Sequence, residues 1–568
     1  MTKVKVSDFI ANQIIKQGIK TVPVFQGGAI FHIIDSIGRN KKLKYYCPYH
    51  EQSLAMGIDA YSRIAGFGIG CVTSGPGATN LITGVCCSYY DSIPNLFFTG
   101  QVGQFHMKKN PNHRQRGFQE TDVAELFSSI TKFSYQIKDP KEIGYIIDKA
   151  IYIAKSGRPG PVVIDVPYNI QTSFIDPKKI RKFTPGKNIL KKNSKQKIIN
   201  LLKSLTSEKK IVIIAGGGIR VSKNISNFSK FIKKIGIPFV TSWSSQDITK
   251  YDEKLYFGSV GRHGNQCANE IISAAELVIT LGFRFAPKAI NENFGKNPKI
   301  KIVSIDIDQQ ELNDSIVKKD IKINADLNIF FKIYKKVKIN RYRNLNWIKY
   351  CVEKKKEKFT NNWILKDKKN NKVNPYYFFH KLSNLVKKDS IIFTDTGANL
   401  CWCMLSFRVK KNQRLISAWG NGPMGYSISA GIGARYAEKN KQIISIIGDG
   451  SFMINVQDMQ FLKHHKSNLK IIVIDNQSLG NTRLGTKNVF NGRTFGNEKK
   501  NGYYPPDVKK ISNAFSINYI KLEKDSEIEP TIKYFLRTKK TSLLHVKILA
   551  DFDVIDHSQK LLQSCYKF

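Results

Sequence analysis

The chain has 568 residues, which is too long for a single hydrophobic core and predicts three or four domains. Hydrophobic residues make up 41% of it, no apolar run approaches the roughly 20 residues of a membrane helix, and the N-terminus lacks the apolar block of a signal peptide. We therefore expect a cytoplasmic protein, and its nine cysteines, which form no CxxC pair, are typical of reduced thiols.

The chain is strongly basic, with 91 Lys and Arg against 44 Asp and Glu and a formal charge of +47. A nucleic-acid-binding protein has this sign of charge when its basic residues gather in a groove or stripe. Here the lysines are scattered through every segment together with many Asn and Ile. We therefore expect a basic surface that favours anionic substrates, with nucleic-acid binding as the disfavoured alternative.

Short apolar strands alternate with helical stretches along the chain, which predicts an α/β fold with three doubly wound parallel-sheet domains. We expect these domains to cover residues 1–172, 192–335 and 370–550. The strands that carry this prediction lie in the segments 20–25, 68–74, 94–102, 160–167, 209–222, 236–243, 275–285, 301–312, 389–400, 442–452, 469–478 and 541–549. Two polar, Lys-rich stretches at 176–197 and 334–359 are expected to separate the domains.

Polar residues follow two neighbouring strands of the third domain. Asp449 ends the first strand and Asn476 the second, and the 27 positions between them accommodate one helix and one strand. Successive parallel strands end at the same sheet edge, where a carboxylate and an amide oxygen suit Mg²⁺ with phosphate oxygens. Gly448, Gly450 and Ser451 can bring backbone N–H groups to a diphosphate. The combination predicts a metal-diphosphate site, although either half alone is more often a tight turn or a cap.

These motifs resemble those of thiamin-diphosphate enzymes, in which GDG is followed after roughly thirty residues by Asn. The segments "HEQSLAMGIDAYSRIAG", "TSGPGATNLITGV", "GFQETD", "RPGPVVIDVP" and "PMGYSISAGIGA" appear in the order of the acetolactate (acetohydroxyacid) synthase large-subunit family. The resemblance covers nearly the whole chain and is closest to a divergent subgroup. It implies a pyrimidine-binding, a central FAD-binding-like and a diphosphate-binding domain.

The resemblance also implies an activity. A 2-keto acid, pyruvate, is decarboxylated with thiamin diphosphate and Mg²⁺, and the hydroxyethyl carbanion adds to a second carbonyl, as in branched-chain amino acid biosynthesis. In this family the two halves of the active site meet across a subunit interface, which implies a homodimer or homotetramer.

Several cofactor contacts are carried over by the resemblance. Glu51 in "YHEQ" matches the carboxyl group that exchanges a proton with the cofactor pyrimidine, although an acid in the first turn of a helix is common without such a role. Gly422 and Met424 match pyrimidine contacts, with Met424 as an apolar wedge that would otherwise be a core residue. The backbone carbonyl of Ser478 would be the third protein ligand to Mg²⁺. Two further matched cofactor-binding positions are Gly397 and Asn399.

The central domain raises the question of a flavin. Its first strand runs into three glycines, a weak dinucleotide signal that lacks the full GxGxxG spacing. The resemblance implies FAD, and structural turns are the alternative. Four positions fall where the family holds FAD: Gly217, Gly282, Arg284 and Asp306. Lys288 replaces an Arg of the family pattern.

The substrate positions match only in part. Phe118 and Gln119 match residues that line the pyruvate pocket, but Tyr168 replaces a family Lys and Gly485 replaces a Trp that shapes the acceptor side. Losing an indole should open the acceptor pocket. Other segments resemble homologues that transfer the acetyl unit of pyruvate to a keto group of a nucleotide-linked sugar, in branched-sugar or surface-polysaccharide synthesis. That acceptor and a basic nucleic-acid-binding protein on an inactive enzyme scaffold are therefore the alternatives to acetolactate synthesis.

Overall fold

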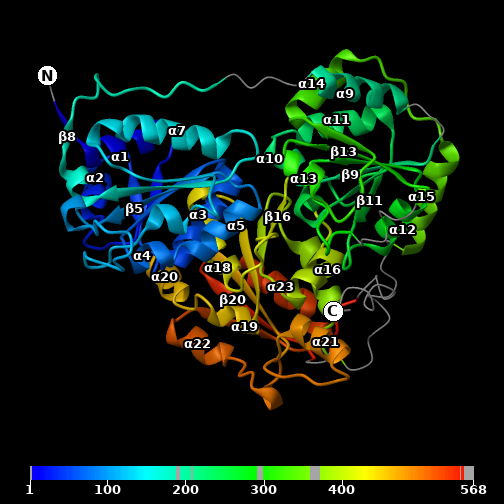
Figure 1. Ribbon diagram of the computed structural model, residues 1–568. Coiled ribbons are helices and arrows are strands. Elements are labelled where there is room, and N and C mark those ends of the chain that lie inside the picture. The colour runs from blue at the N-terminus through cyan, green and yellow to red at the C-terminus, as the bar shows by residue number, and fades with distance from the viewer. Residues whose placement is uncertain are drawn as a thin grey trace.

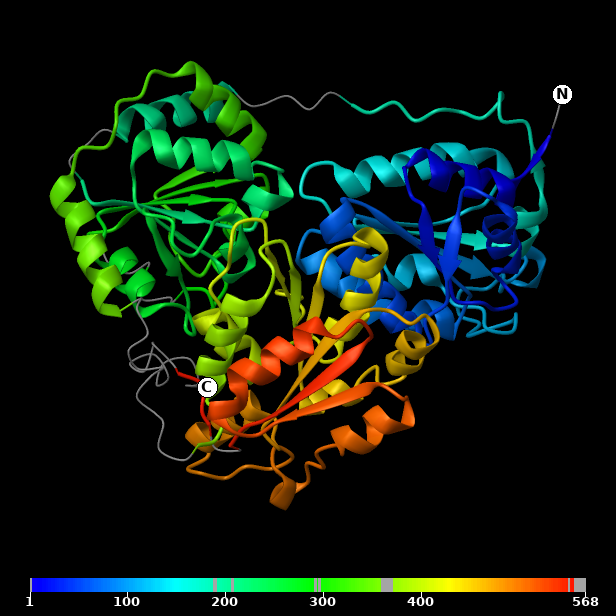
Figure 2. The same cartoon turned by 180° about the vertical axis from the view of Figure 1, so that it is seen from behind.

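The computed structural model describes residues 3–186, 192–205, 209–290, 294, 298–358, 371–549 and 552–555. The chain forms three α/β bodies, each built on its own parallel sheet (Figure 1). The N-terminal body (blue) and the central body (green) lie side by side, and the C-terminal body (yellow to red) packs below them, as the view from behind also shows (Figure 2). The predicted fold class is confirmed. In the part of the chain that is described, no helix combines the length and apolarity needed to cross a membrane.

The N-terminal domain has a four-stranded parallel sheet in the order β4-β5-β7-β6. Strands β5 and β7 are buried along their whole length, as expected for parallel strands covered by helices on both faces. The strands are β4 (Gly68–Val72), β5 (Asn95–Gln101), β6 (Phe133–Gln136) and β7 (Pro161–Pro167), with the short pairs β1 (Val4–Lys5) and β8 (Phe174–Ile175), and β2 (Thr21–Pro23) and β3 (Lys44–Tyr46). The helices are α1 (Val6–Lys16), α2 (Phe31–Arg39), α3 (Glu51–Ala65), α4 (Pro76–Thr79), α5 (Ile82–Tyr90), α6 (Val123–Leu126), α7 (Ile143–Lys155) and α8 (Tyr168–Thr172).

The central domain has a six-stranded parallel sheet in the order β11-β10-β9-β12-β13-β14. The strand order reverses between β9 and β12, and such switch points are where open α/β sheets bind ligands. The strands are β9 (Ile211–Ala215), β10 (Phe239–Thr241), β11 (Tyr256–Ser259), β12 (Leu277–Leu281), β13 (Lys301–Asp306) and β14 (Ile321–Asn324). The helices are α9 (Lys192–Ser204), α10 (Gly218–Val221), α11 (Ile225–Ile235), α12 (Gln266–Ala274), α13 (Gln309–Asn313), α14 (Leu327–Lys336) and α15 (Leu345–Lys358).

The C-terminal domain has a second six-stranded parallel sheet, in the order β16-β15-β17-β18-β20-β19. Its switch point lies between β15 and β17. The strands are β15 (Ile391–Thr394), β16 (Arg414–Ile416), β17 (Ile443–Gly448), β18 (Leu469–Asp475), β19 (Asn518–Leu522) and β20 (Ser542–Lys547). The helices are α16 (Pro375–Leu385), α17 (Ala398–Ser406), α18 (Tyr426–Ala437), α19 (Asp449–Met453), α20 (Asp458–His464), α21 (Gly480–Val489), α22 (Val508–Ala514) and α23 (Ile528–Arg537).

The basic stretch at 334–359 does more than separate two domains, contrary to the sequence interpretation. Trp347 at the start of α15 is buried and donates its indole N–H to the Ile211 carbonyl of β9 at 2.9 Å. The Tyr342 hydroxyl bonds the Lys209 carbonyl, and Cys351 is also buried against the central core. A few large side chains bury one face of this segment, although many of its residues are charged.

Helices α3 and α18 join the N-terminal and C-terminal domains by close backbone approach. A Cβ atom on Gly433 of α18 would lie 1.9 Å from the Gly57 carbonyl oxygen of α3. Near the same contact, the rings of Tyr46 and Tyr436 stack with centroids 4.0 Å apart. The start of α3, and the residues in its first turn, are thereby held against the C-terminal domain.

Candidate active site

The register of β17 and β18 joins the two predicted metal-binding segments. Gly448 pairs with Ile474, so that Asp449 and Asn476 follow directly at the same edge of the sheet. Both side chains are buried, and so is Ser478. Asn476 donates its amide N–H to the Ser478 hydroxyl at 3.0 Å, which fixes the amide relative to this segment. Strand register alone therefore brings the three proposed metal ligands to one edge.

The Asp449 carboxylate has the character of a cation ligand. Its Oδ2 atom is buried and has no hydrogen-bond partner among the described residues. Burial, and then the neighbouring Asp475 carboxylate, raise the pKa of Asp449 well above its ordinary value. A divalent cation would bind the unpartnered oxygen. Its charge would also offset the burial and the repulsion from Asp475 that disfavour the ionised carboxylate. One carboxylate, one amide oxygen and one carbonyl, with waters and phosphate oxygens, suit Mg²⁺.

No group of three or more His, Cys, Asp or Glu side chains is arranged for a metal within the described ranges. This excludes, for those residues, the His- and Cys-rich sets that transition metals prefer. The site at Asp449 combines one carboxylate with neutral oxygen donors, and such a set of ligands suits Mg²⁺.

Asp475 lies behind this site, and the sequence interpretation gave it no role. Its Oδ2 atom bonds His545 Nε2 at 2.8 Å, and the other ring nitrogen of His545 bonds the Tyr519 hydroxyl at 2.8 Å. Burial acts against ionisation, but the bonds from His545 and Gln477 lower the pKa of Asp475 below its ordinary value. A second anionic carboxylate therefore lies beside Asp449 and strengthens the attraction for a cation.

The predicted diphosphate contacts gather at the switch point of the C-terminal sheet. Gly397 precedes α17 with φ +102°, and Asn399 donates its amide N–H to the Asp395 carbonyl at 3.0 Å. The Asn399 Oδ1 atom lies 3.5 Å from the position that a Cβ of Gly448 would occupy. The loops after β15 and β17 are therefore in contact, and Ser451 is buried one turn further on.

A side chain at Gly450 would displace its neighbours. A Cβ atom at this position would lie 2.8 Å from Leu479 Cδ2 and 2.9 Å from the Tyr503 hydroxyl. It would lie 3.4 Å from Met424 Cε, so that the predicted wedge faces the predicted diphosphate loop. Gly422 has φ +58° and begins the turn that leads to Met424.

Glu51 is buried at the start of α3. The helix begins here because His50 Nδ1 accepts the backbone N–H of Gln52 at 3.0 Å, and it ends at Gly66, which has φ +92°. Asn80 donates its amide N–H to Glu51 Oε2 at 2.9 Å. A buried carboxyl oriented by one neutral donor can hold or exchange a proton with a bound base.

The first turn of α3 reaches the C-terminal domain of the same chain. Gln52 donates to Asn455 Oδ1 at 3.2 Å, and Asn455 donates to the Gly425 carbonyl beside Met424 at 3.0 Å. Within the described ranges, no hydrogen bond or ion pair joins Glu51 itself to Asp449, Asn476 or Ser478.

The predicted substrate residues lie on the far side of the Gly75–Gly77 turn from Glu51. A Cβ on Gly77 would be 3.5 Å from Glu51 Oε1, and one on Gly75 would be 2.8 Å from Cβ of Gln119. Gln119 has φ +62°, a strained value for a residue with a side chain. Phe118, in contrast, is 84% exposed, so the described part of this chain builds no apolar wall around it.

The predicted flavin residues follow three adjacent strands, because Gly217 follows β9, Gly282 follows β12, and Asp306 ends β13. The Gly218 backbone N–H donates to the Gly282 carbonyl at 3.0 Å, so these glycines also allow two loops to touch. Burial raises the pKa of Asp306 to about 6. Arg284 turns toward the N-terminal domain, with its Nη1 atom 3.5 Å from the Tyr90 carbonyl.

Comparisons with known proteins agree with this arrangement. The sequence matches three family models described as thiamine pyrophosphate enzyme domains: the N-terminal TPP binding domain over 4–126, the central domain over 198–332 and the C-terminal TPP binding domain over 395–546. An acetolactate synthase large subunit of Lactococcus lactis is 32% identical, covering 93% of this chain and 90% of the relative.

Two other relatives are similar over comparable lengths. The acetolactate synthase isozyme 2 large subunit of Escherichia coli is 28% identical over 95% of both chains. A probable acetolactate synthase large subunit of Methanocaldococcus jannaschii is 29% identical over 94% of this chain and 90% of its own length.

Proposed function

Because the chain belongs to the thiamine pyrophosphate enzyme family, together with the acetolactate synthase large subunits, we propose that it decarboxylates pyruvate and ligates the resulting two-carbon unit to a second carbonyl. The observation that carries the proposal is the buried, unpartnered oxygen of Asp449 at the joined ends of β17 and β18. The keto-sugar and nucleic-acid alternatives are not favoured, since the relatives described above are acetolactate synthases.

Different residues would bind different parts of the cofactor. Asp449, the amide oxygen of Asn476 and the carbonyl of Ser478 would hold Mg²⁺ and through it the diphosphate. Backbone N–H groups around Gly397, Gly448 and Gly450, with the side chains of Asn399 and Ser451, would contact the diphosphate. Gly422 and Met424 would set the position of the pyrimidine. When bound, thiamin diphosphate supplies a nucleophilic carbon and an electron sink for decarboxylation.

Glu51 would move the proton that activates the cofactor. Its carboxyl group would exchange a proton with a pyrimidine nitrogen, and Asn80 would keep the carboxyl in one orientation. Gln119 and Phe118 would contact the substrate, and Phe118 would be covered only when a second chain or a substrate lies over it.

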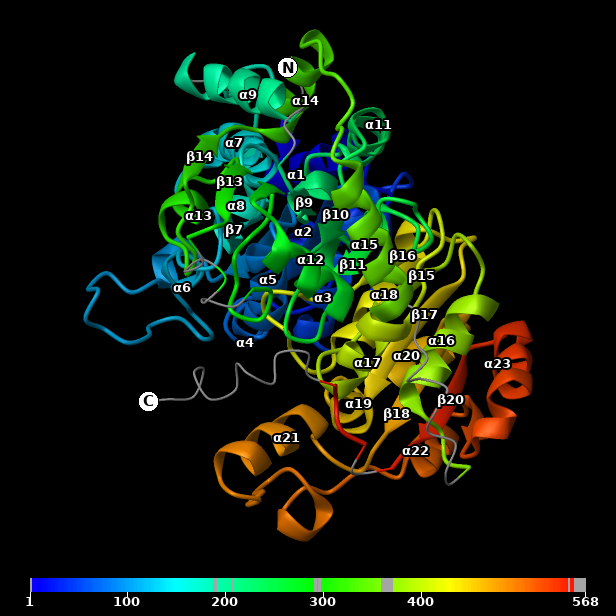
Figure 3. The same cartoon turned by 90° about the vertical axis from the view of Figure 1, so that its right-hand side faces the viewer.

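We infer an oligomer whose active sites lie between chains. The segment between β5 and α6 and helix α21 project from the same side of the molecule (Figure 3). The first segment exposes Phe105 and Phe118, and the residues that follow α21 expose Phe490, Phe495 and Tyr504. Such large aromatic side chains would be costly to leave in water. Light scattering after size-exclusion chromatography tests this, because a single-chain mass at micromolar concentration would overturn it.

FAD is a further part of the proposal. Gly217, Gly282, Arg284 and Asp306 would hold it at the switch point of the central sheet. Purified protein should then carry a flavin, measured by visible absorbance and fluorescence after denaturation. We also propose a cytoplasmic location, because the cysteines among the described residues are thiols and not disulfides.

Product analysis tests the reaction itself. The full-length chain is incubated with thiamin diphosphate, Mg²⁺ and pyruvate, alone or with 2-ketobutyrate or a keto-sugar nucleotide, and the products are identified by mass spectrometry. Acetolactate from pyruvate alone is the expected product. Turnover only in the presence of the sugar nucleotide would assign the acceptor differently, and no turnover with any acceptor would overturn the proposal.

A further inference from the structure

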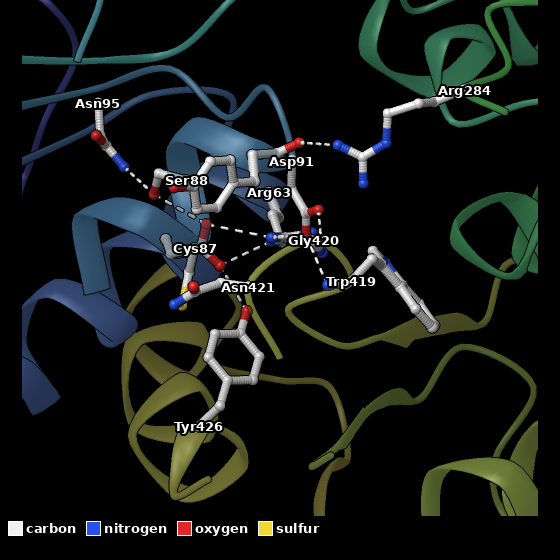
Figure 4. Close-up of polar contacts among 12 residues, drawn as sticks. Arg63, Cys87, Ser88, Asp91, Asn95, Arg284, Trp419, Gly420, Asn421 and Tyr426 are labelled. Atoms are coloured by element: carbon white, nitrogen blue, oxygen red, sulfur yellow. Dashed lines mark hydrogen bonds and ion pairs between the residues drawn. The ribbon is translucent and has the colours of Figure 1, made fainter. Parts of the chain in front are cut away.

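A buried carboxylate of the N-terminal domain holds the loop that carries two proposed cofactor contacts. We define the wedge loop as residues 418–425, which include Gly422 and Met424. Asp91 follows α5, and its two carboxylate oxygens accept the consecutive backbone N–H groups of Trp419 and Gly420, each at 2.8 Å (Figure 4). These residues are 328 and 329 positions apart from Asp91 in sequence.

Arg63 holds Asp91 in this position. Its Nη2 atom lies 2.7 Å from Asp91 Oδ2 and its Nε atom 2.7 Å from Asp59 Oδ2. The three side chains are at most 6% exposed, and Figure 4 shows Arg63 beside Asp91. A guanidinium stays charged in such surroundings, so its charge-assisted hydrogen bonds can hold both neighbouring carboxyl groups in place.

Further contacts tie the same loop to the N-terminal domain. Asn421 donates its amide N–H to the Thr83 carbonyl of α5 at 3.1 Å. The Tyr426 hydroxyl, just after the loop, donates to Asp59 at 2.6 Å. At Gly420 a Cβ atom would lie 2.6 Å from Cβ of Tyr90, so the backbone packs directly on the end of α5. After these contacts the loop continues to Met424, whose side chain lies next to Gly450.

We propose that Asp91, fixed by Arg63, is a positioning residue. It holds the wedge loop in the position from which Gly422 and Met424 contact the cofactor. The inference rests on the proposed function, since the loop matters to the reaction only if thiamin diphosphate binds there. Asp91 touches neither substrate nor cofactor and acts through the backbone of Trp419 and Gly420.

The test compares two variants of the full-length holoenzyme. Asp91→Asn keeps the size of the side chain but loses one acceptor and the charge that Arg63 requires. The matched control is Asp247→Asn. Asp247 is also buried, pairs with Arg220 and Arg414 at 2.8 and 3.0 Å, and accepts the Leu415 N–H at 3.2 Å, without contacting the wedge loop.

We expect both variants to lose thermal stability, but only Asp91→Asn to lose kcat at saturating cofactor, by about 100-fold, with the pyruvate KM nearly unchanged. Hydrogen exchange of the apoprotein gives a readout without turnover. The Trp419 and Gly420 amides should lose protection in Asp91→Asn and keep it in Asp247→Asn. Should Asp91→Asn fail to fold, Asn421→Ala removes one anchor only and should lower kcat in the same direction by a smaller factor.

The outcomes separate this inference from the proposed function. Equal kcat in the two variants, or unchanged exchange of the two loop amides, would overturn the positioning role while wild-type turnover upholds the reaction. A wild-type protein without turnover would overturn the proposed function and this role together.

Discussion

At the scale of single residues, the protein buries several carboxyl groups, and each has a different set of partners. Asp449 is left with an unpartnered oxygen, Asp475 is bonded by His545, and Asp91 is paired with Arg63. Glu51 has one neutral donor, Asn80. Because an unpaired buried charge is costly, the unpartnered oxygen of Asp449 beside a second carboxylate fits a cation, and the single neutral donor to Glu51 leaves that carboxyl able to exchange a proton.

Glu51→Gln should abolish proton exchange while keeping the shape of the side chain. We expect turnover of pyruvate to fall by at least about 100-fold, with folding and Mg²⁺-dependent cofactor binding retained. Steady-state kinetics and calorimetric titration measure the two effects. Asn80→Ala, which removes only the orienting bond, should lower turnover less. Full activity in Glu51→Gln would refute the assigned role.

Asp458 gives a pH prediction outside the site. Burial raises its pKa to about 6, its Oδ2 atom accepts the Ser429 hydroxyl at 2.6 Å, and its Oδ1 atom is unpartnered. Since the folded-state pKa exceeds the unfolded value near 4, this carboxyl stabilises the fold most below pH 4, and that contribution disappears as the pH rises through 6.

Asp458→Asn stays neutral at every pH. It should therefore be more stable than wild type at pH 8, by on the order of 1–3 kcal/mol, and the difference should shrink toward pH 4. Unfolding midpoints between pH 4 and pH 8 measure it. A stability difference that does not change with pH would contradict the assignment.

At the scale of elements, strand register and helix packing position the proposed site residues that each chain contributes. The ends of β15, β17 and β18 supply the proposed diphosphate and metal contacts, while α3 supplies Glu51. The α3–α18 contact places that helix start against the C-terminal domain, and it depends on two small residues that face each other, Gly57 and Gly433.

Gly433→Ala should disrupt this contact. The new methyl group would meet the Gly57 carbonyl, which belongs to helix backbone and cannot move aside alone. We expect a loss of at least about 2 kcal/mol of stability. The control is Gly485→Ala in α21, where nothing lies within 4 Å of the added atom and the helix should become slightly more stable. Equal unfolding midpoints for the two variants would argue against the packing role of Gly433.

The open space at Gly485 also yields a specificity prediction. A Trp at this position has room to extend from α21, and it should narrow the acceptor side of the proposed pocket. With pyruvate and 2-ketobutyrate supplied together, Gly485→Trp should shift the product ratio away from the bulkier acceptor by a few-fold. The measurement is the ratio of the two products, with Gly485→Ala as the control. An unchanged ratio would place α21 away from the acceptor.

At the scale of the whole molecule, the parts that the sequence predicts are those set by local pattern. Long apolar runs predict the buried strands, and the polar residues that end β17 and β18 predict a shared edge, because parallel register follows from the crossover helix. Edge strands such as β14 and β19 have mixed polarity and give little signal. The buried face of α15 could not be recognised in the sequence, because the helix contains many lysines.

Contacts between residues far apart in sequence could not be predicted in this way. His545 meets Asp475 across 70 positions, and Asp91 reaches the backbone of Gly420 across 329. No spacing rule connects such residues, because only the packing of β18 on β20 and of one domain on another brings them together. Contacts between chains could not be predicted either. The exposed Phe118 has no partner within its own described chain, and the sequence alone does not show what would cover it.

The most direct test of this account is calorimetric titration of thiamin diphosphate into the full-length apoprotein, with and without Mg²⁺. Binding should require the cation and should weaken by at least about 100-fold in Asp449→Asn, because the variant loses the charged ligand at the joined strand ends. Asp458→Asn, which is equally buried but outside the site, should bind as the wild type does. Tight binding by Asp449→Asn, or binding indifferent to Mg²⁺, would contradict the account.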